Sequence, residues 1–395
     1  MPTFTKTSAR GWVYRWQDFQ DYEVTEDTAG KITMTYSEDR AGQEFESERS
    51  PWQVTFRIKE GAIVRVNWLD ENGENLAVLK GLDFDADYFR LLLSPEVDQP
   101  WQIYQMMISA GTTFEMVRQS RNDSGFDVST GVGDDVVRAI GGEAYIKDNG
   151  GADRYIGDQH RDTVTYDEWF WRAPERVERG IRVDLREEFA IGPDGERDVL
   201  KNIDGVRGTF KRDVLLGNGE DNDFMGFYGR DLIDGRRGFD EVSYRNDESQ
   251  GGFNGVTVNL NKGFAIDGWG KRDTLRSIEA AEGTDQGDRF IGHGRKDNEF
   301  WGRDGDDVFV LRGGDDWVEG GDGADTFVFR GQNFGFDGID DFNPEDGDRI
   351  RIAGADSVDD LTIEVSEDGE TTIFFNQSEI FLNNYGGEVE AYLLF

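Results

Sequence analysis

The chain has 395 residues, a formal net charge of −39 at pH 7, and 32% charged residues. This excess of acid excludes a nucleic-acid ligand, because phosphates would be repelled rather than neutralised, and it favours cations as ligands. Salt adaptation, with the acids serving only as solvated surface, is the alternative explanation of the charge. The sequence has no cysteine, which excludes disulfides and zinc–thiolate sites. No apolar run approaches the roughly 20 residues of a bilayer-spanning helix, so we expect no membrane span.

Residues 1–128 are predicted to form a small β-rich or α+β capping domain. Apolar and polar residues alternate at 31–38, 52–60 and 62–70, as in half-buried strands. The runs DADYFRLLL (85–93) and PWQIYQMMISAG (100–111) are typical of short amphipathic helices. The first residues, MPTFTKTSARGW, contain no apolar segment, so we expect no cleaved N-terminal signal.

A nine-residue repeat follows, in blocks at about 129–165, 213–243 and 288–332. Each unit has a glycine, then an aspartate two residues later, then an apolar residue after two more. The positions that keep an acidic or amide residue are Asp135, Asp153, Asp162, Asp213, Asn222, Asp231, Asp240, Asp288, Asn298, Asp307, Asp316 and Asp325. Ala144 replaces the aspartate in one unit, and the spacing slips by one residue between Asp288 and Asn298.

The repeat predicts a Gly-Asp turn followed by a short strand with one buried apolar side chain. Two units make one coil, so equivalent aspartates recur in every second unit, such as Asp135 with Asp153, Asp213 with Asp231, and Asp307 with Asp325. Adjacent parallel strands lie about 4.8 Å apart, and calcium–oxygen bonds are about 2.3–2.6 Å long. One Ca²⁺ ion therefore fits between two stacked turns, held by carboxylates and turn carbonyls. Mg²⁺ needs a tighter octahedron and suits this spacing less well.

Two inserts, 166–212 and 244–287, separate the blocks and are copies of one module, in which 180–206 aligns with 255–281. Each contains two β-like runs and a D-x-L-x-x-I segment that is predicted to be a short helix or turn. The first insert also contains DEWFWRAPERVERG (167–180), in which Trp169 and Trp171 could contact a sugar or a partner surface. The alternative is that these aromatic side chains pack on the neighbouring insert or on the N-terminal domain.

The segment GGDGADTFV (320–328) matches the calcium nonapeptide G-G-x-G-x-D-x-U-x in full. The chain resembles the haemolysin-type (RTX) calcium-binding repeat family, which is exported by type I secretion systems. The resemblance implies a parallel β-roll that folds around several Ca²⁺ ions outside the cell. Other units depart from the motif, since Arg303 and Arg312 replace its second glycine. The motif glycines expected at the ions are Gly305, Gly314, Gly321 and Gly323.

The segment 333–350 resembles the end-of-roll motif of the same family, with Asp337, Asp341 and Asp348 at its acidic positions. Two strands around an acidic turn are predicted over 360–375. The final residues EAYLLF resemble a type I secretion signal, and an ordinary last strand is the alternative.

The predicted fold is mainly β: an N-terminal domain (1–128), a parallel β-roll with β-rich inserts (129–332), and a C-terminal β cap (333–395). The expected function is a secreted calcium-binding component of a cell surface or matrix. Catalysis is not expected, because no zinc-protease, serine-hydrolase or P-loop motif is present. The alternative is a carbohydrate-active or carbohydrate-binding protein that uses the roll as a platform, with an extracellular glycan as partner.

Overall fold

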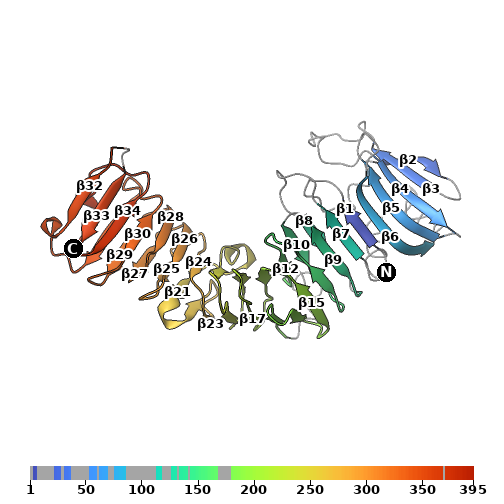
Figure 1. Cartoon of the computed structure of the whole chain (residues 1–395), viewed down its shortest axis with the longest axis horizontal. Helices are drawn as coiled ribbons and strands as arrows, with labels where there is room; N and C mark the ends of the chain where they lie inside the picture. The colour runs from blue at the N-terminus through green and yellow to red at the C-terminus, as the bar shows by residue number, and fades with distance from the viewer. Residues whose placement is uncertain are drawn as a thin grey trace. The chain divides into compact units, whose positions relative to one another are not determined.

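In the computed structural model, the described part comprises the backbone of seven N-terminal strands and residues 126–130, 133–140, 143–167, 179–367 and 370–395 (Figure 1). The N-terminal strands are β1 (Thr3–Lys6), β2 (Tyr22–Asp27), β3 (Lys31–Tyr36), β4 (Gln53–Lys59), β5 (Ala62–Leu69), β6 (Asn75–Asp85) and β7 (Thr113–Val117). Strands β2 to β6 pair antiparallel in sequence order, and β1 joins β6 to β7. The predicted strands at 31–38, 52–60 and 62–70 are confirmed. The two predicted helices lie outside the described residues, apart from Asp85 in β6.

The chain divides into two compact units, 1–178 with 187–206, and 179–186 with 207–395. In the first unit, β9 (Val136–Ile140) and β11 (Arg154–Ile156) pair in parallel in one sheet. In the other sheet, β10 (Ala144–Lys147) lies between β8 (Phe126–Ser129) and β12 (Thr163–Thr165), also in parallel. Successive strands thus alternate between two sheets. The predicted boundaries at 128 and 332 remain predictions.

The second unit repeats this alternation. Its first sheet contains β13 (Arg182–Asp184), β17 (Val214–Leu216), β19 (Leu232–Asp234), β23 (Arg272–Arg276), β21 (Thr257–Asn259), β25 (Arg289–Ile291), β27 (Val308–Leu311), β29 (Thr326–Arg330) and β31 (Arg349–Ala353). Its second sheet contains β18 (Asp223–Met225), β20 (Glu241–Ser243), β24 (Ala280–Glu282), β26 (Glu299–Asp304), β28 (Trp317–Asp322), β30 (Phe336–Ile339) and β34 (Ser378–Leu382). Val308 is in register with Thr326, the equivalent residue one coil later. This mainly β, parallel, two-sheet fold confirms the predicted fold class.

The core between the sheets is built from the one apolar side chain that each short strand turns inward. Phe290, Phe309 and Phe327 are fully buried and form a stack, with ring centroids 5.1 and 5.3 Å apart. The stack arises because parallel strands in register place equivalent side chains directly above one another. Because each repeat unit has the same spacing, the turn aspartates also lie at equivalent positions in successive coils.

The inserts form hairpins, and here one prediction is wrong. The D-x-L-x-x-I segments contain β15 (Arg197–Lys201) and β23, which pair antiparallel with β14 (Phe189–Ile191) and β22 (Phe264–Ile266). Asp198 and Leu200 are both buried, whereas Arg197 and Lys201 are exposed. This alternation has the period of two that is typical of a strand, so the segment is a strand and not the short helix or turn that was predicted.

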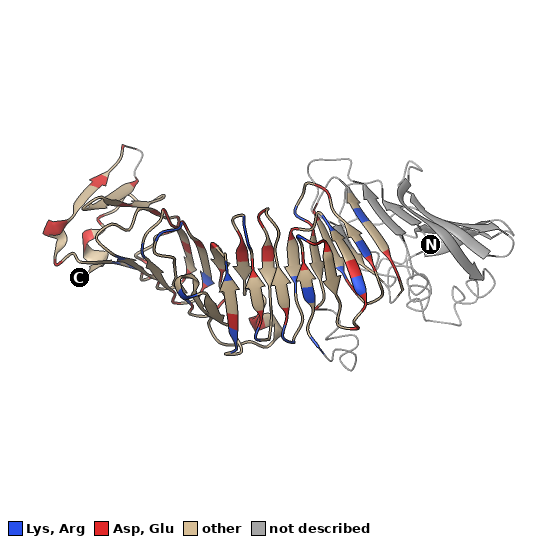
Figure 2. Cartoon of the chain, turned by 60° about the horizontal axis from the view of Figure 1, so that its bottom comes forward, with Lys and Arg blue, Asp and Glu red and all other residues tan. Residues whose placement is uncertain are grey.

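The C-terminal segment confirms the two predicted strands, β32 (Thr362–Val365) and β33 (Thr371–Phe375), which pair antiparallel. The last residues form a short 3₁₀ turn (Glu390–Tyr392) and β35 (Leu393–Leu394), which pairs in parallel with β31. Acidic side chains recur at the turns and strand ends (red in Figure 2). Within the described residues, no helix is long and apolar enough to cross a membrane.

Candidate metal centre

A ladder of buried carboxylates runs along the turns of the stacked coils. The backbone N–H of Asp307 donates to Asp325 Oδ1 one coil later, at 2.9 Å. Asp213 donates in the same way to Asp231 at 2.8 Å, and Asp135 to Asp153 at 2.7 Å. The structure therefore brings together the aspartates that the two-unit spacing pairs. We call the residues in these positions the ladder residues.

All but one of the predicted acidic and amide site residues belong to this ladder and are buried. At most 3% of the surface is exposed in Asp135, Asp153, Asp162, Asp213, Asn222, Asp231, Asp240, Asp288, Asn298, Asp307, Asp316, Asp325, Asp337 and Asp348. Asp341 is only partly buried, and its carboxylate accepts the N–H groups of Gly320 and Gly321 at 2.8 and 2.6 Å. Trp169 and Trp171 lie outside the described residues.

The second carboxylate oxygen of several ladder residues has no hydrogen-bond partner in the described part of the chain. These atoms are Oδ2 of Asp231, Asp240, Asp307, Asp316, Asp325 and Asp337. A buried polar oxygen without a partner is unfavourable, and such atoms are rare in folded proteins. These unpaired oxygens recur at equivalent positions, where they could bind a cation.

The glycine that opens a regular turn provides space for such an ion. The regular turn spans six residues, with this glycine at position one and the ladder residue at position six, as in 302–307 and 320–325, whereas 292–298 has seven residues and 311–316 begins with Leu311. A Cβ atom on Gly302 would overlap both Asp307 Oδ2 and the carbonyl oxygen of Gly320. A Cβ atom on Gly217 would likewise lie 2.5 Å from Asn222 Oδ1 and 2.5 Å from the carbonyl oxygen of Gly235. At each of these glycines, a side-chain oxygen of the turn and a carbonyl oxygen of the next coil thus face the space that the side chain of any other residue would occupy.

The other motif glycines permit the left-handed backbone of the turn. Gly305, Gly314, Gly321 and Gly323 have φ values of 122°, 114°, 95° and 144°, which favour glycine. The donor set of carboxylates and carbonyls is entirely hard oxygen, which suits Ca²⁺ or Mg²⁺ rather than softer metals. The residues present therefore fit a bound alkaline-earth ion.

The tightest acidic cluster lies in the first unit and was only partly predicted. Ligand atoms of Asp148, Asp153 and Asp198 lie within 4.8 Å of one another, and all three residues are buried. Tyr155 Oη lies 2.7 Å from Asp148 Oδ2 and 2.5 Å from Asp153 Oδ2, and Tyr166 Oη donates to Asp198 at 2.9 Å. These buried clusters could hold metal ions.

Asp198 extends the ladder into the first insert, because it accepts the N–H of Asp153 at 3.0 Å. Asp273 does the same for Asp231 in the second insert, at 2.9 Å. The sequence prediction missed both, since they lie in the inserts, outside the blocks of nine-residue units. The signal that could have found them is the aspartate of the duplicated D-x-L-x-x-I segment.

Burial dominates the electrostatics of the ladder. It raises the pKa of Asp307 to about 7, of Asp325 to about 8 and of Asp337 to about 9, while a backbone N–H bonded to each carboxylate opposes the rise. Neighbouring carboxylates add to the upward shift. Without a bound cation, these carboxyl groups are therefore protonated in part at neutral pH and lose their protons as the pH rises to about 9.

We expect the metal-free protein to lose stability as the pH rises from about 5 to 9. A carboxyl whose pKa is higher in the folded than in the unfolded chain binds its proton more tightly when folded. Its stabilising contribution is complete below its unfolded pKa and disappears as the pH rises through the folded pKa of Asp307 and Asp325. Each such group adds up to about 1.4 kcal/mol per pH unit. Denaturant unfolding in chelator at several pH values measures this, and stability that rises over the range would contradict it.

The two histidines lie in turns. His160 Nδ1 is 2.6 Å from Asp158 Oδ1. His293 Nδ1 is 3.2 Å from Asn298 Nδ2, and burial lowers the pKa of His293. Each histidine thus contacts a residue of its own turn.

Comparison with known protein families and with curated proteins finds no match. Among solved structures, the chain is similar to the extracellular lipase LipA from Serratia marcescens, at 12% identity and a TM-score of 0.20. The matched region covers 80% of this chain and 51% of the lipase chain, so the chain spans about half the length of that lipase. A TM-score this low carries no argument about fold or function. The fold and the site themselves define a β protein of stacked parallel coils with buried aspartate clusters that could hold metal ions.

Proposed function

We propose that the chain is a secreted calcium-binding protein of the RTX type, acting without catalysis as a surface, matrix or adhesion component. One observation carries the proposal: ladder carboxylates with an unpaired buried oxygen recur beside glycine-lined spaces between coils. The nonapeptide at 320–328 agrees with it. Ca²⁺ suits the site better than Mg²⁺, since it accepts irregular sets of six to eight oxygens.

In this proposal, Asp307 and the carbonyl group of Gly320 would hold one ion, and Asp325 would contribute to a site one coil later. A bound Ca²⁺ ion supplies two positive charges among carboxylates that otherwise repel one another. The ladder N–H bonds fix one oxygen of each carboxylate, which leaves the other oriented toward the space beside the glycine. Because the site exists only when coils stack, the binding free energy adds to folding. A chain that is unfolded where calcium is scarce would then be suited to type I export.

Metal analysis after equilibrium dialysis tests the proposal. We expect several Ca²⁺ ions per chain, and fewer in Asp307→Asn and Asp325→Asn variants. A protein that binds no Ca²⁺ at millimolar concentration would contradict the proposal, as would ions that are retained in full by both variants.

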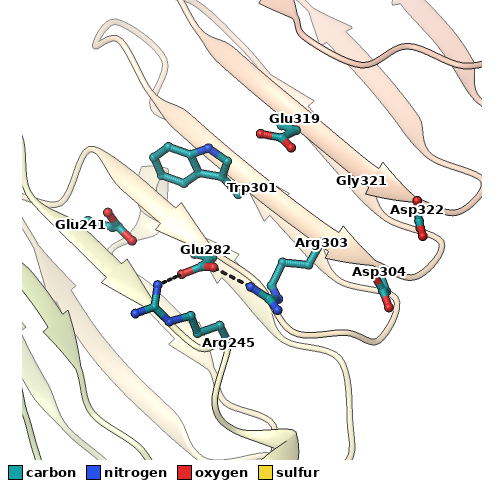
Figure 3. Close-up of a pocket in the computed structure, with 9 residues that line it drawn as sticks. All are labelled: Glu241, Arg245, Glu282, Trp301, Arg303, Asp304, Glu319, Gly321 and Asp322. Atoms are coloured by element: carbon teal, nitrogen blue, oxygen red, sulfur yellow. Dashed lines mark hydrogen bonds and ion pairs between the residues drawn. The ribbon is translucent and has the colours of Figure 1, made fainter. Parts of the chain in front are cut away.

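A second candidate function, glycan binding, is favoured by a groove on the second sheet of the second unit (Figure 3). The groove has a volume of about 530 Å³ and is lined by Glu241, Arg245, Glu282, Trp301, Arg303, Asp304, Glu319, Gly321 and Asp322. Figure 3 shows Trp301 between Glu282 and Glu319. An aromatic ring among hydrogen-bonding side chains is suited to stack on a sugar. The net charge of −39 disfavours acidic glycans, so the ligand would be a neutral oligosaccharide.

Trp301→Ala is expected to weaken binding of a neutral oligosaccharide at least about tenfold, by removing the stacking surface. Trp317→Ala is the matched control, because Trp317 is exposed on the same sheet but lies over Gly338 and donates to Asp340. A glycan screen of the folded variants in calcium measures the effect. Equal binding by Trp301→Ala and wild type would exclude the groove, and loss in Trp169→Ala or Trp171→Ala alone would place the site in the 167–180 segment.

A further inference from the structure

Position two of the turn is an arginine in three coils, and two of these arginines, Arg236 and Arg303, have a positive φ. In the complete nonapeptide, this position is Gly321, with φ 95°. The equivalent residue is Arg236 in the turn 235–240, with φ 71°, and Arg303 in the turn 302–307, with φ 83°. Positive φ is unfavourable for a residue with a long side chain. Phe227 has φ 61° at the same position of the turn 226–231, so the turn itself imposes this conformation, and the arginines are distinguished by the contacts of their side chains.

Arg236 makes those contacts with oxygens of the two preceding strands of its sheet. Its Nη1 and Nη2 donate to the two carboxylate oxygens of Asp184, at 2.8 and 2.9 Å. Nη1 also donates to the carbonyl oxygen of Gly217 at 2.6 Å. Gly217 opens the turn one coil earlier, and Asp184 ends β13 in the coil before that. The guanidinium group thus binds the same classes of oxygen, carboxylate and position-one carbonyl, as the candidate ion sites.

Arg303 repeats the arrangement in another part of the second unit. Its Nε donates to Asp285 at 2.8 Å, and its Nη1 donates to Glu282 at 2.8 Å (Figure 3). Asp285 belongs to the turn 283–288, one coil earlier. Two arginines at the same turn position therefore reach back to acids of earlier coils, Arg236 across two coils and Arg303 across one. Gly321, which has no side chain, cannot do this.

The duplicated module provides a natural comparison for the Arg236 pair. Asn259 occupies the position of Asp184 in the second copy of the module. Asn259, Ile291 and Val310 are in register on adjacent strands, as are Asp184, Leu216 and Asp234. Arg312 follows Val310 by two residues, as Arg236 follows Asp234, so Arg312 occupies the position of Arg236. Among the described residues, the buried Nε of Arg312 has no hydrogen-bond partner. Arg312 also lacks the positive φ of Arg236, so the two positions differ in backbone conformation as well as in the residue that faces the arginine.

We propose that Arg236 is a built-in cation that replaces a bound Ca²⁺ ion between the turns 217–222 and 235–240. This inference rests on the proposed function and specifies which coils need the ion. Arginine remains charged at all physiological pH values, and its planar fork matches a carboxylate. The coils joined by Arg236 therefore stay neutralised when calcium is absent, whereas coils with glycine at position two depend on the ion.

The test replaces Arg236 with the glycine of the complete motif. Arg236→Gly is expected to bind one more Ca²⁺ ion per chain than wild type, to be less stable in chelator, and to regain stability in calcium. Arg237→Gly removes the same charge from an exposed neighbouring position and is expected to leave the ion count unchanged. Adding Asp184→Asn to Arg236→Gly is expected to abolish the additional ion. Arg236→Lys keeps the charge and is expected to gain none.

Metal analysis and thermal unfolding of these variants distinguish the possible results. An unchanged ion count in Arg236→Gly, with equal loss of stability in calcium and in chelator, would show an ordinary ion pair and overturn the inference. A variant that calcium does not refold would overturn it as well. Failure of the proposed function is a separate result, namely a wild-type protein that binds no Ca²⁺, and a gain of one ion in Arg236→Gly would still support the built-in cation.

Discussion

Replacing Phe309 with alanine is expected to lower the free energy of unfolding by about 3–5 kcal/mol. The Phe309 ring is fully buried and stacks on both Phe290 and Phe327, with interplanar angles of 6° and 8°. Its removal leaves a cavity that the neighbouring coils cannot close, because backbone hydrogen bonds fix their spacing. Denaturant unfolding in saturating calcium measures the change.

Phe253→Ala is the control for that experiment, since Phe253 is 71% exposed and its truncation is expected to change stability by less than about 0.5 kcal/mol. If Phe309→Ala were as mild as the control, the rings would not form the continuous core described above.

Replacing Asp325 with asparagine is expected to have opposite effects in calcium and in chelator. The amide oxygen of asparagine can still accept the Asp307 N–H, but the charge is lost. In chelator the variant is expected to be as stable as wild type or more stable, because Asp307, Asp341 and Asp348 no longer repel a carboxylate. In calcium it is expected to lose about 2.7 kcal/mol, the contribution of one site when calcium is at 100 times its dissociation constant.

Asp322→Asn makes the same charge change on an exposed residue three positions earlier and is expected to behave like wild type in both conditions. Paired denaturation curves, with and without calcium, measure both variants. A loss of stability in Asp325→Asn that is equal in calcium and in chelator would indicate a hydrogen-bonding role alone.

The nine-residue period of the sequence predicted both the stacked coils and the ladder of aspartates, because each unit contains one strand, one turn and one inward-facing side chain. Asp307 and Asp325 could be paired from spacing alone, since a coil of two units returns the chain to the same edge. Asp148 and Asp198 could not be found in this way, because their contacts depend on where a hairpin insert returns to the sheet. Local spacing does not determine that return.

Arg303 and Arg312 appear in the sequence only as departures from the glycine motif. The structure shows that two arginines at this position form ion pairs with acids of earlier coils. Arg236 pairs with Asp184 two coils back, and Arg303 pairs with Asp285 one coil back. These acidic partners lie far from the arginines in the sequence, so the pairs can be identified only once the register of the strands is known.

The central claim is that calcium and folding are coupled, and far-UV circular dichroism through a calcium titration tests it most directly. The titration runs from chelator to about 10 mM calcium, with magnesium at matched ionic strength as the control. We predict a steep increase in β structure that calcium produces and magnesium does not. An equal β signal in chelator and in calcium, from protein that metal analysis shows to be free of bound ions, would contradict the claim.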